Sequence, residues 1–299
     1  MQEFLICLVV KLNLTFGAFV IESASKAIHK KLALLMKIGV TGKQGRMGRT
    51  NARLVMQHSI AELKSGLVRS GSNLDGTDVA EFVGFDKNGN KITADIDLFI
   101  NSCDAIIDFS SPALSLQIAE KCAAAKKVLV SGPTGFSDAE KVKFASYANE
   151  ALIIWSSNMS LGVNLLMNLV EKTAGILHDD FDIEIVEMHH RNKVDAPSGT
   201  ALSLGAAAAI GRAVEIATVG RTTRSGKEAK REKGEISFAA LRGGDVIGDH
   251  TVIFAGDGER LELTHKASNR DIFAKGAIRA AIWGSARQPG FYSMRDVLA

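Results

Sequence analysis

One segment of the chain, residues 184–202, concentrates side chains that could bind an anion or move a proton. It reads EIVEMHHRNKVDAPSGTAL and places His189, His190, Arg191 and Lys193 shortly before a Pro-Ser-Gly-Thr turn. Adjacent histidines on an extended chain point to opposite faces, and no cysteine or third histidine stands at ligand spacing, so we expect no metal site. The alternatives are then a nucleophile, an anion site and a charged surface loop.

The Pro-Ser-Gly-Thr turn favours one of two interpretations, a nucleophile or an anion site. Ser198 does not lie in the strand-to-helix G-x-S-x-G arrangement that exposes a nucleophilic serine. A helix is predicted to begin at this turn, and its first N–H groups, at Gly199 and Thr200, would attract a carboxylate by about 0.3–1 kcal/mol. His189 or Lys193 would then act as general acid, which contributes roughly 10²–10⁴-fold in rate. The segment predicts a carboxylate site with a proton donor, and a charged surface loop is the alternative.

A second group of residues, the glycines of GKQGRMG, could hold phosphates. Gly42, Gly45 and Gly48 follow an apolar run and precede a helical pattern, with a G-x-x-G-x-x-G spacing in place of the usual G-x-G-x-x-G. Glycines let the backbone approach a pyrophosphate, and the helix aims its N–H groups at it. Arg46 adds a positive charge beside the phosphates. The turn predicts a dinucleotide site, and a plain tight turn is the alternative.

The residues after the second predicted strand indicate which of the two nicotinamide cofactors, NADH or NADPH, is bound. An Asp or Glu at this place would bind the ribose hydroxyl of NAD, but the segment reads GLVRSGS and offers Val68. Arg69 can instead pair with a 2′-phosphate, and Ser70 and Ser72 stand close by. The sequence favours NADPH. NADH held by backbone groups is the alternative, and Arg69 would then be an ordinary surface arginine.

These residues are positioned by strands that alternate with helices. Parallel strands connected by right-handed crossovers predict a Rossmann-like, doubly wound sheet. Ligands of such sheets bind at the carboxyl ends of the strands, so we expect residues 108–112, 131–136 and 156–164 near the cofactor. Strands are predicted at residues 37–42, 62–70, 104–111, 127–132 and 151–157, and helices at 112–127 and 137–150.

The second half of the chain has a different pattern. Residues 180–188 alternate, with Ile183, Ile185 and Val186 expected on the buried face. Glycine-rich turns join three further apolar runs, which predicts an antiparallel arrangement within a smaller α+β domain with an open mixed sheet. Its exposed face would suit a homo-oligomer. The three runs are residues 234–244, 248–258 and 259–268, and helices are predicted at 201–213 and 271–286.

Composition excludes several classes of protein. The chain has 299 residues, of which 46% are hydrophobic and 23% charged, so it can bury a sizeable core. The net charge of +3 includes no dense basic run interleaved with aromatic residues, so we expect no nucleic-acid partner. The three cysteines are sparse, as in a reducing compartment, and Cys122 is expected in the core.

The first 35 residues are expected to lie outside the enzyme fold. They are apolar but interrupted by Lys11 and Asn13, and Glu3 stands where a signal peptide has a cation. The run is too interrupted for a membrane span. An upstream start codon is our interpretation, with a weak membrane anchor as the alternative.

Several motifs resemble those of the dihydrodipicolinate reductase family, which acts in the diaminopimelate and lysine pathway. The segment EIVEMHHRNKVDAPSGTA is similar to the family signature, and VTGKQGRMGR resembles the family's cofactor loop. GPTGF resembles its GTTGF loop, while RGGDVIGDHT and LTHKASNR resemble later segments. The resemblance runs from Met36 to the C-terminus. It implies NAD(P)H-dependent reduction of 4-hydroxy-tetrahydrodipicolinate in a cytoplasmic homotetramer, with a small dicarboxylate substrate and no membrane or metal.

The resemblance also implies a role for individual residues. His189 would donate or accept a proton, and Lys193 would donate one. The substrate carboxylates would be bound by His190, Gly199 and Thr200. The cofactor would be held by Gly42, Lys43, Gln44, Gly45, Arg46, Met47, Arg69, Gly132, Pro133, Thr134, Ser156, Ser157, Asn158 and Met159.

Three features depart from the family pattern. Val68 stands where some members carry Glu, Pro133 replaces a threonine, and the first 35 residues have no counterpart. The chain is accordingly divided into an extension (1–35), a dinucleotide-binding domain (36–159, with 268–299 returning to it) and a substrate-binding and tetramerisation domain (160–267). Another amino-acid dehydrogenase and a non-catalytic NADPH sensor are the alternative functions, and neither would need both the H-H-x-x-K and the P-S-G-T motifs.

Overall fold

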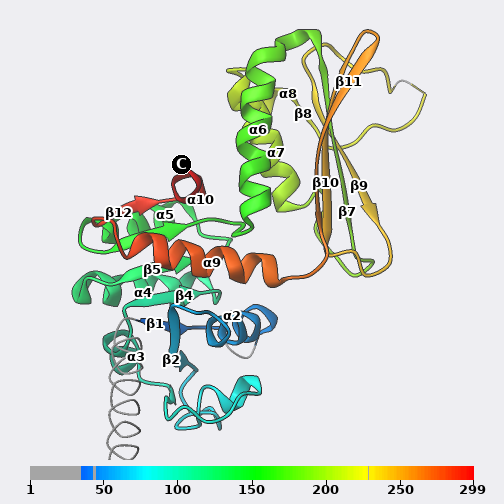
Figure 1. The fold of residues 1–299 in the computed structure, drawn as a ribbon. Helices are drawn as coiled ribbons and strands as arrows, with labels where there is room; N and C mark the ends of the chain where they lie inside the picture. Colours follow the sequence, from blue (N-terminus) through cyan, green and yellow to red (C-terminus); the bar gives the residue numbers. More distant parts are fainter. Residues whose placement is uncertain (1–34, 43–44, 228) are drawn as a thin grey trace, which may run out of the picture.

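The computed structural model describes residues 35–42, 45–227 and 229–299, which form two β-sheets connected by helices (Figure 1). The first sheet has the order β3-β2-β1-β4-β5-β6-β12, and all its strand pairs are parallel. The chain runs outward from β1 in one direction and from β4 in the other, which confirms the predicted doubly wound sheet. Its strands are β1 (Met36–Val40), β2 (Ala61–Leu67), β3 (Ile92–Thr93), β4 (Ala105–Asp108), β5 (Val128–Ser131), β6 (Leu152–Trp155) and β12 (Gly290–Tyr292).

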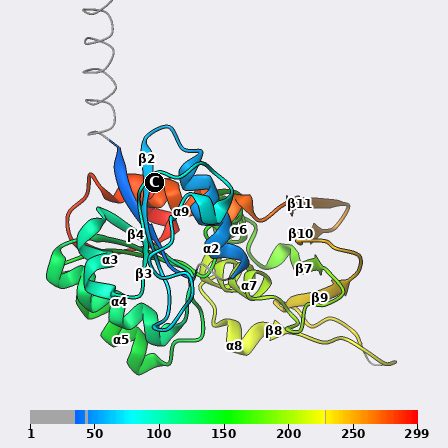
Figure 2. The same ribbon diagram turned by 90° about the horizontal axis from the view of Figure 1, so that it is seen from below.

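Helices cover both faces of this sheet because successive strand residues point to opposite sides. Ile107 and Val130 pack with α2 and α9, whereas Ile106 and Leu129 pack with α3, α4 and α5. Figure 2 shows these two groups of helices on opposite sides of the strands. The helices are α2 (Arg46–Met56), α3 (Ile96–Ser102), α4 (Pro112–Ala125), α5 (Asp138–Ser146), α9 (Asp271–Gly284) and α10 (Met294–Leu298), with short 3-10 turns η1 (Glu81–Val83) and η2 (Tyr147–Asn149).

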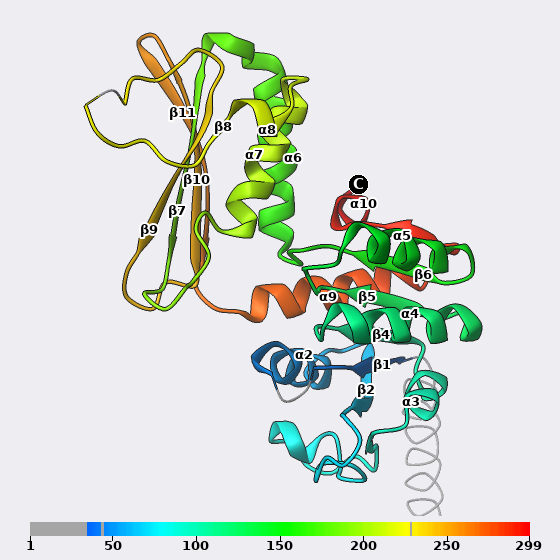
Figure 3. The same ribbon diagram turned by 180° about the vertical axis from the view of Figure 1, so that it is seen from behind.

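The second sheet has the order β11-β10-β7-β9-β8, and α6 and α7 pack on one of its faces (Figures 1 and 3). Ile183 and Ile185 of β7 point into this helical layer, against Leu204 and its neighbours. The elements are α6 (Leu161–Leu177), η3 (His178–Asp180), β7 (Asp182–His189), α7 (Gly199–Gly211), α8 (Ile216–Val219), β8 (Gly220–Arg221), β9 (Ile236–Arg242), β10 (Gly248–Gly256) and β11 (Glu259–Ala267).

The predicted antiparallel order of the last three strands is wrong for β9. Only β10 and β11 form the expected hairpin, whereas β9 pairs in parallel with β7, which lies between β9 and β10. The glycine-rich link after β9 passes over the end of β7, where the Gly243 N–H donates to the His189 carbonyl at 2.9 Å. A glycine-rich link between two strands is typical of a hairpin, which is why the sequence predicted one here. Because the link crosses β7 instead, β7 has a strand partner on each edge.

The expectation for Val186 is also wrong. Because strand residues alternate, Val186 lies on the face opposite Ile185, where it is half-buried. The same open face carries Met188, Leu241 and Ile253, according to the strand registers. Leu241 is 49% exposed. This sheet therefore presents four apolar side chains, next to polar ones such as Glu184 and Thr251, on the side away from α6 and α7.

Three findings concern targeting and cysteines. Within the described ranges, no helix is long and apolar enough to cross a membrane. Cys122 is fully buried, as predicted, and Cys103 is a second buried free thiol. The predicted N-terminal extension, apart from residue 35, lies outside the described residues.

Candidate active site

The glycine turn lies at the carboxyl end of β1, as the sequence predicts. Gly42 has a φ of +66°, and a side chain there would lie 2.7 Å from the Phe109 carbonyl oxygen. The Gly45 N–H donates to the Gly42 carbonyl at 2.8 Å, and α2 begins at the next residue, Arg46. Gly42 is therefore required by the backbone path, whereas Gly45 has an extended backbone, and a side chain there would lie 3.2 Å from the Gly42 carbonyl oxygen. Met47 is half-buried against the core, and Lys43 and Gln44 lie outside the described residues.

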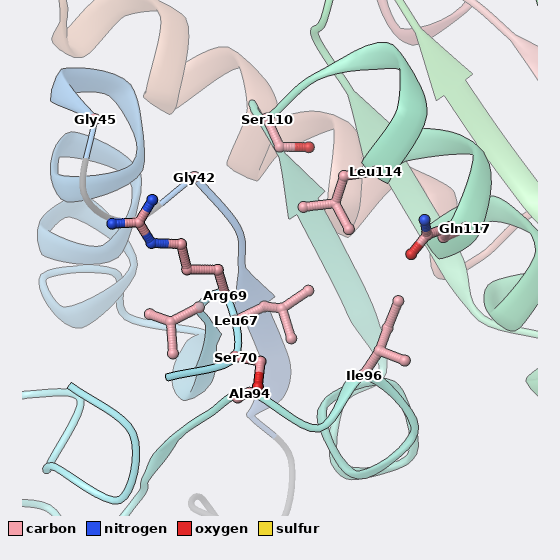
Figure 4. Close-up of a pocket in the computed structure, with 11 residues that line it drawn as sticks. Gly42, Gly45, Leu67, Arg69, Ser70, Ala94, Ile96, Ser110, Leu114 and Gln117 are labelled. Carbon is pink, nitrogen blue, oxygen red and sulfur yellow. The ribbon is translucent and has the colours of Figure 1, made fainter. Parts of the chain in front are cut away.

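A cleft of about 430 Å³ opens beside this turn (Figure 4). Gly42, Gly45 and Arg69 line it, and the Arg69 guanidinium points toward the two glycines. Leu67, Ile96 and Leu114 supply apolar walls, and Val68 and Ser70 also line the cleft. The cleft thus has apolar walls as well as two glycines and one arginine.

A buried carboxylate organises the strand ends around this cleft. Asp108, at the end of β4, has no exposed surface and accepts hydrogen bonds from the hydroxyls of Thr41 (2.5 Å), Ser110 (2.6 Å), Ser115 and Ser131 (3.4 Å). The Ser110 N–H donates as well, at 3.1 Å. Thr41 precedes Gly42 and Ser131 precedes Gly132, so one side chain fixes the ends of β1, β4 and β5.

The other predicted cofactor residues lie along the same edge of the sheet. Gly132 packs so closely on Phe109 that a side chain at Gly132 would approach the ring to 2.8 Å, and the Pro133 carbonyl accepts from the Trp155 indole at 3.1 Å. Thr134 is exposed. These three residues are not among those that line the cleft of Figure 4.

Residues 156–159 form the turn that leads from the first sheet to α6. The Ser156 hydroxyl donates to the Asn158 carbonyl at 2.8 Å, Ser157 is exposed and Met159 is buried. The Asn158 amide donates to the Thr200 hydroxyl at 3.0 Å. This contact connects the predicted cofactor turn to the predicted substrate site at the start of α7.

A second cleft, of about 690 Å³, lies between the two sheets. Arg46, at the start of α2, lines it together with His190 and Arg191, which follow β7. Arg270, the residue before α9, is also part of its wall, and so is Asp245. Three arginines against a single carboxylate give the cleft a positive character, which suits an anionic ligand.

The helix expected after the Pro-Ser-Gly-Thr turn is α7, and it begins at the predicted place. Ser198 is the N-cap and accepts from the Ala201 N–H at 3.1 Å, so the helix begins at Gly199. Gly199 is exposed, with open space where a side chain would be. Lys193 is bound to both carboxylate oxygens of Asp195, at 2.8 and 2.9 Å, and 20% of its side chain is exposed.

His189 is held in a buried polar network below this surface. Its Nδ1 lies 2.5 Å from Oε2 of Glu187, which has no exposed side-chain surface. Arg242 donates to both oxygens of Glu187, at 2.9 and 3.0 Å, and the Ser198 N–H donates to Oε1 at 3.1 Å. The ring of His250 packs edge-on against that of His189, with centroids 5.2 Å apart.

Burial and hydrogen bonding set the protonation states in this network. Burial by itself raises the pKa of Glu187, but hydrogen bonds from Arg242 and His189 outweigh it and lower the pKa. Burial lowers the pKa of His189 despite its contact with Glu187, and burial lowers the pKa of His250 to about 4. Near neutral pH, Glu187 is therefore ionised while both histidines are neutral.

Three residues of the site were not identified from the sequence. Glu187 follows Ile183 and Ile185 on the same face of β7, so the period of two that marks the buried face could have found it. Arg242 and Arg270 reach the site from distant segments; they lie in the family-like segments RGGDVIGDHT and LTHKASNR, but the sequence assigned no role to either arginine. The structural description contains no group of three or more His, Cys, Asp or Glu side chains able to hold a metal ion.

The doubly wound sheet with its glycine turn, together with the cationic cleft beside a mixed sheet, defines an oxidoreductase with a Rossmann-like nucleotide-binding fold. Comparison with known proteins identifies the family. The dihydrodipicolinate reductase N-terminal model matches residues 36–159, and the C-terminal model matches residues 162–298. The chain belongs to the dihydrodipicolinate reductase family.

Individual relatives agree with this assignment. The 4-hydroxy-tetrahydrodipicolinate reductase of Beijerinckia indica subsp. indica is 49% identical over 263 residues, which cover 88% of this chain and 97% of the relative. The enzyme of the same name from Bartonella tribocorum is 50% identical over 264 residues, 88% of this chain and 98% of the relative. A dipicolinate-bound dihydrodipicolinate reductase from Paenisporosarcina sp. TG-14 has the same fold, with a TM-score of 0.67, 24% identity and coverage of 87% of this chain and 97% of its own.

Proposed function

We propose that this chain reduces 4-hydroxy-tetrahydrodipicolinate to tetrahydrodipicolinate with NADPH, in the biosynthesis of diaminopimelate and lysine. The curated relatives that support this proposal match over almost their whole length. Among this chain's own residues, the contact between Asn158 and Thr200 carries the proposal. It joins the turn at the nucleotide-binding edge to the start of α7, so a hydride donor and a carboxylate site can share one substrate.

The residues of the first cleft fit a dinucleotide. Gly42 and Gly45 leave the backbone bare where a pyrophosphate would approach, and Arg46 adds a charge beside it. The apolar walls suit an adenine ring, and Arg69 faces the place of a 2′-phosphate with no carboxylate at Val68 to oppose it. This arrangement favours NADPH, with NADH as the second cofactor. When bound, the reduced nicotinamide supplies a hydride, and the segments 132–134 and 156–159 would hold its nicotinamide end.

The second site would bind the substrate carboxylates. The Thr200 hydroxyl accepts from Asn158, which leaves its own proton free to donate to a carboxylate. The first N–H groups of α7, at Gly199 and Thr200, add the positive end of the helix dipole. His190 lines the cationic cleft and would reach the second carboxylate.

Lys193 is the proton donor in this proposal. An ammonium group has three N–H donors, and Asp195 engages it without removing its charge, so at least one N–H is left for the substrate. Neutral His189 presents its other ring nitrogen as an acceptor, which makes it the proton-accepting partner of the pair. Reduction of a C=N or C=C bond needs one hydride and one proton, and Lys193 would supply the proton.

We also propose the division of the chain and its assembly. Residues 36–159 with 268–299 would form the dinucleotide-binding domain, and residues 160–267 the substrate-binding and tetramerisation domain. The apolar side chains of Val186, Met188, Leu241 and Ile253 support a homotetramer built on this open face. The cytoplasm is the proposed compartment, in agreement with the free thiols of Cys103 and Cys122.

The test is an assay of nicotinamide oxidation with freshly prepared 4-hydroxy-tetrahydrodipicolinate, using NADPH and NADH in parallel. We expect turnover with both, a higher kcat/KM with NADPH, and competitive inhibition by pyridine-2,6-dicarboxylate. A protein that binds NADPH but does not oxidise it with this substrate would refute the proposed function and favour a sensor.

A further inference from the structure

Glu187 lies beside the proposed catalytic residues, but the proposed function gives it no role. It is an ionised carboxylate with no exposed surface, and four donors surround it: the His189 ring, two guanidinium N–H groups of Arg242 and the Ser198 N–H. The contacts lie between 2.5 and 3.1 Å. A buried charge is costly unless it is fully satisfied, and this one is satisfied only by residues that adjoin the site.

The first consequence concerns the protons of His189. A carboxylate is only an acceptor, so the nitrogen that faces it, Nδ1, must carry the ring proton. The neutral ring then presents an unprotonated Nε2. On the other side, Gly248 leaves room for that nitrogen, since a side chain at Gly248 would lie 2.9 Å from it. Glu187 thereby selects one tautomer and one orientation of His189.

The second consequence concerns the surrounding loops. Ser198, whose N–H binds Glu187, is the N-cap of α7, so the contact fixes the helix start that presents Gly199 and Thr200. Arg242 also donates to the Asp195 carbonyl at 2.7 Å, and the Asp195 carboxylate holds Lys193. The Glu187 carboxylate is thus connected to His189 directly, to Lys193 through Arg242 and Asp195, and to the start of α7 through Ser198.

We propose that Glu187 is a positioning residue of this enzyme, which holds His189 as the Nδ1–H tautomer and aligns it with Lys193 and the start of α7. The inference rests on the proposed function for its kinetic effect but not for the tautomer. The charged and titratable groups that face His189 are Glu187 on its own strand, Arg242 from β9, His250 from β10 and Lys193 from the loop after β7. Of these, Glu187 is the negative one, and it touches Nδ1.

The test begins with the unsubstituted full-length protein. Selective ¹⁵N labelling of histidine, with assignment by the variant His189→Gln, should give the ¹⁵N shifts of a neutral ring protonated at Nδ1. A wild-type ring protonated at Nε2 would overturn the proposal, whether or not any variant folds. This measurement needs no substrate, so it remains decisive even if the reductase assay fails.

The variant Glu187→Gln then tests the functional consequence. An amide matches the carboxylate in size but can also donate, so the Nδ1–H tautomer should lose its preference and the pKa of His189 should fall further. We expect kcat to fall by ~10²–10⁴-fold, as for loss of acid–base catalysis, with unchanged NADPH binding. Glu235→Gln is the matched control, because Glu235 is also a buried glutamate paired with arginines in this sheet but lies away from the site.

The two variants separate positioning from general stability. If Glu187 were merely structural, Glu187→Gln would lose unfolding free energy as Glu235→Gln does, but the His189 shifts and the pH profile of kcat would stay unchanged, which would overturn the proposal. Wild-type turnover in Glu187→Gln would overturn it as well. Reduced turnover with a changed tautomer in Glu187→Gln alone would support it.

Discussion

Replacing Gly276 by alanine should impair the active site from a helix that contributes no catalytic group. Gly276 lies in α9, where the carbonyl of Met159 packs directly on its Cα. An added Cβ would lie 1.7 Å from that oxygen, whereas real Cβ atoms essentially never come closer than 3.0 Å. The carbonyl must therefore retreat by about 1.3 Å, and it belongs to the turn whose Asn158 binds Thr200.

Two opposing effects determine the magnitude. Alanine is favoured over glycine within a helix by about 1 kcal/mol, which would stabilise the variant. Overpacking a tight contact typically costs about 1–3 kcal/mol, and here the contact is with backbone, which cannot rotate away as a side chain can. We expect a net loss of up to about 2 kcal/mol in unfolding free energy. A shift of about 1 Å in positioning groups can cost roughly 10²-fold in rate, so kcat/KM should fall by that order.

The assay combines urea unfolding with steady-state kinetics of the reductase reaction. Lys275→Ala is the control, because Lys275 is the exposed neighbour in the same helix and gains only helix propensity. It should keep wild-type stability and kcat/KM within a small factor. If Gly276→Ala is as stable and as active as this control, the close approach of Met159 to α9 does not position the site.

Three further predictions concern single residues. Lys193→Ala should lower turnover by ~10²–10⁴-fold while fluorescence titration gives an unchanged Kd for NADPH; unchanged turnover would eliminate Lys193 as proton donor. Arg69→Ala should raise the KM for NADPH and leave that for NADH unaltered, and an equal effect on both would argue against a 2′-phosphate contact. Burial lowers the pKa of His250 from 6.5 to about 4, so the unfolded state takes up its proton first as the pH falls through that range. Unfolding free energy should drop by on the order of 3 kcal/mol across this window. Denaturant titrations at several pH values should show that the unfolding free energy of His250→Gln depends less steeply on pH than that of the wild type. An identical pH dependence would show that His250 is not the titrating group.

The sequence predicts the first sheet well because its signals are local. Each strand, such as the one ending at Asp108, is a short apolar run followed by a turn and a helix start, and these are properties of neighbouring residues. The glycine at residue 42 is likewise expected at the turn after the first strand, and the structure gives it a φ of +66°, which glycine adopts more readily than other residues. The position of β9 could not be predicted in the same way, since strand order depends on which distant segment covers β7.

The chemistry of the site divides along the same line. The sequence alone identified the candidate proton-transferring groups, His189 and Lys193, and predicted that a helix begins beside them, because capping and strand patterns act over a few residues. Only the tertiary structure decided the protonation and the hydrogen-bond partners of these groups. Glu187 is buried by packing, Arg242 arrives from 55 positions further along the chain, and together they settle which nitrogen of His189 holds a proton. Burial and long-range ion pairing are properties of the folded chain, so no reading of the local pattern could supply them.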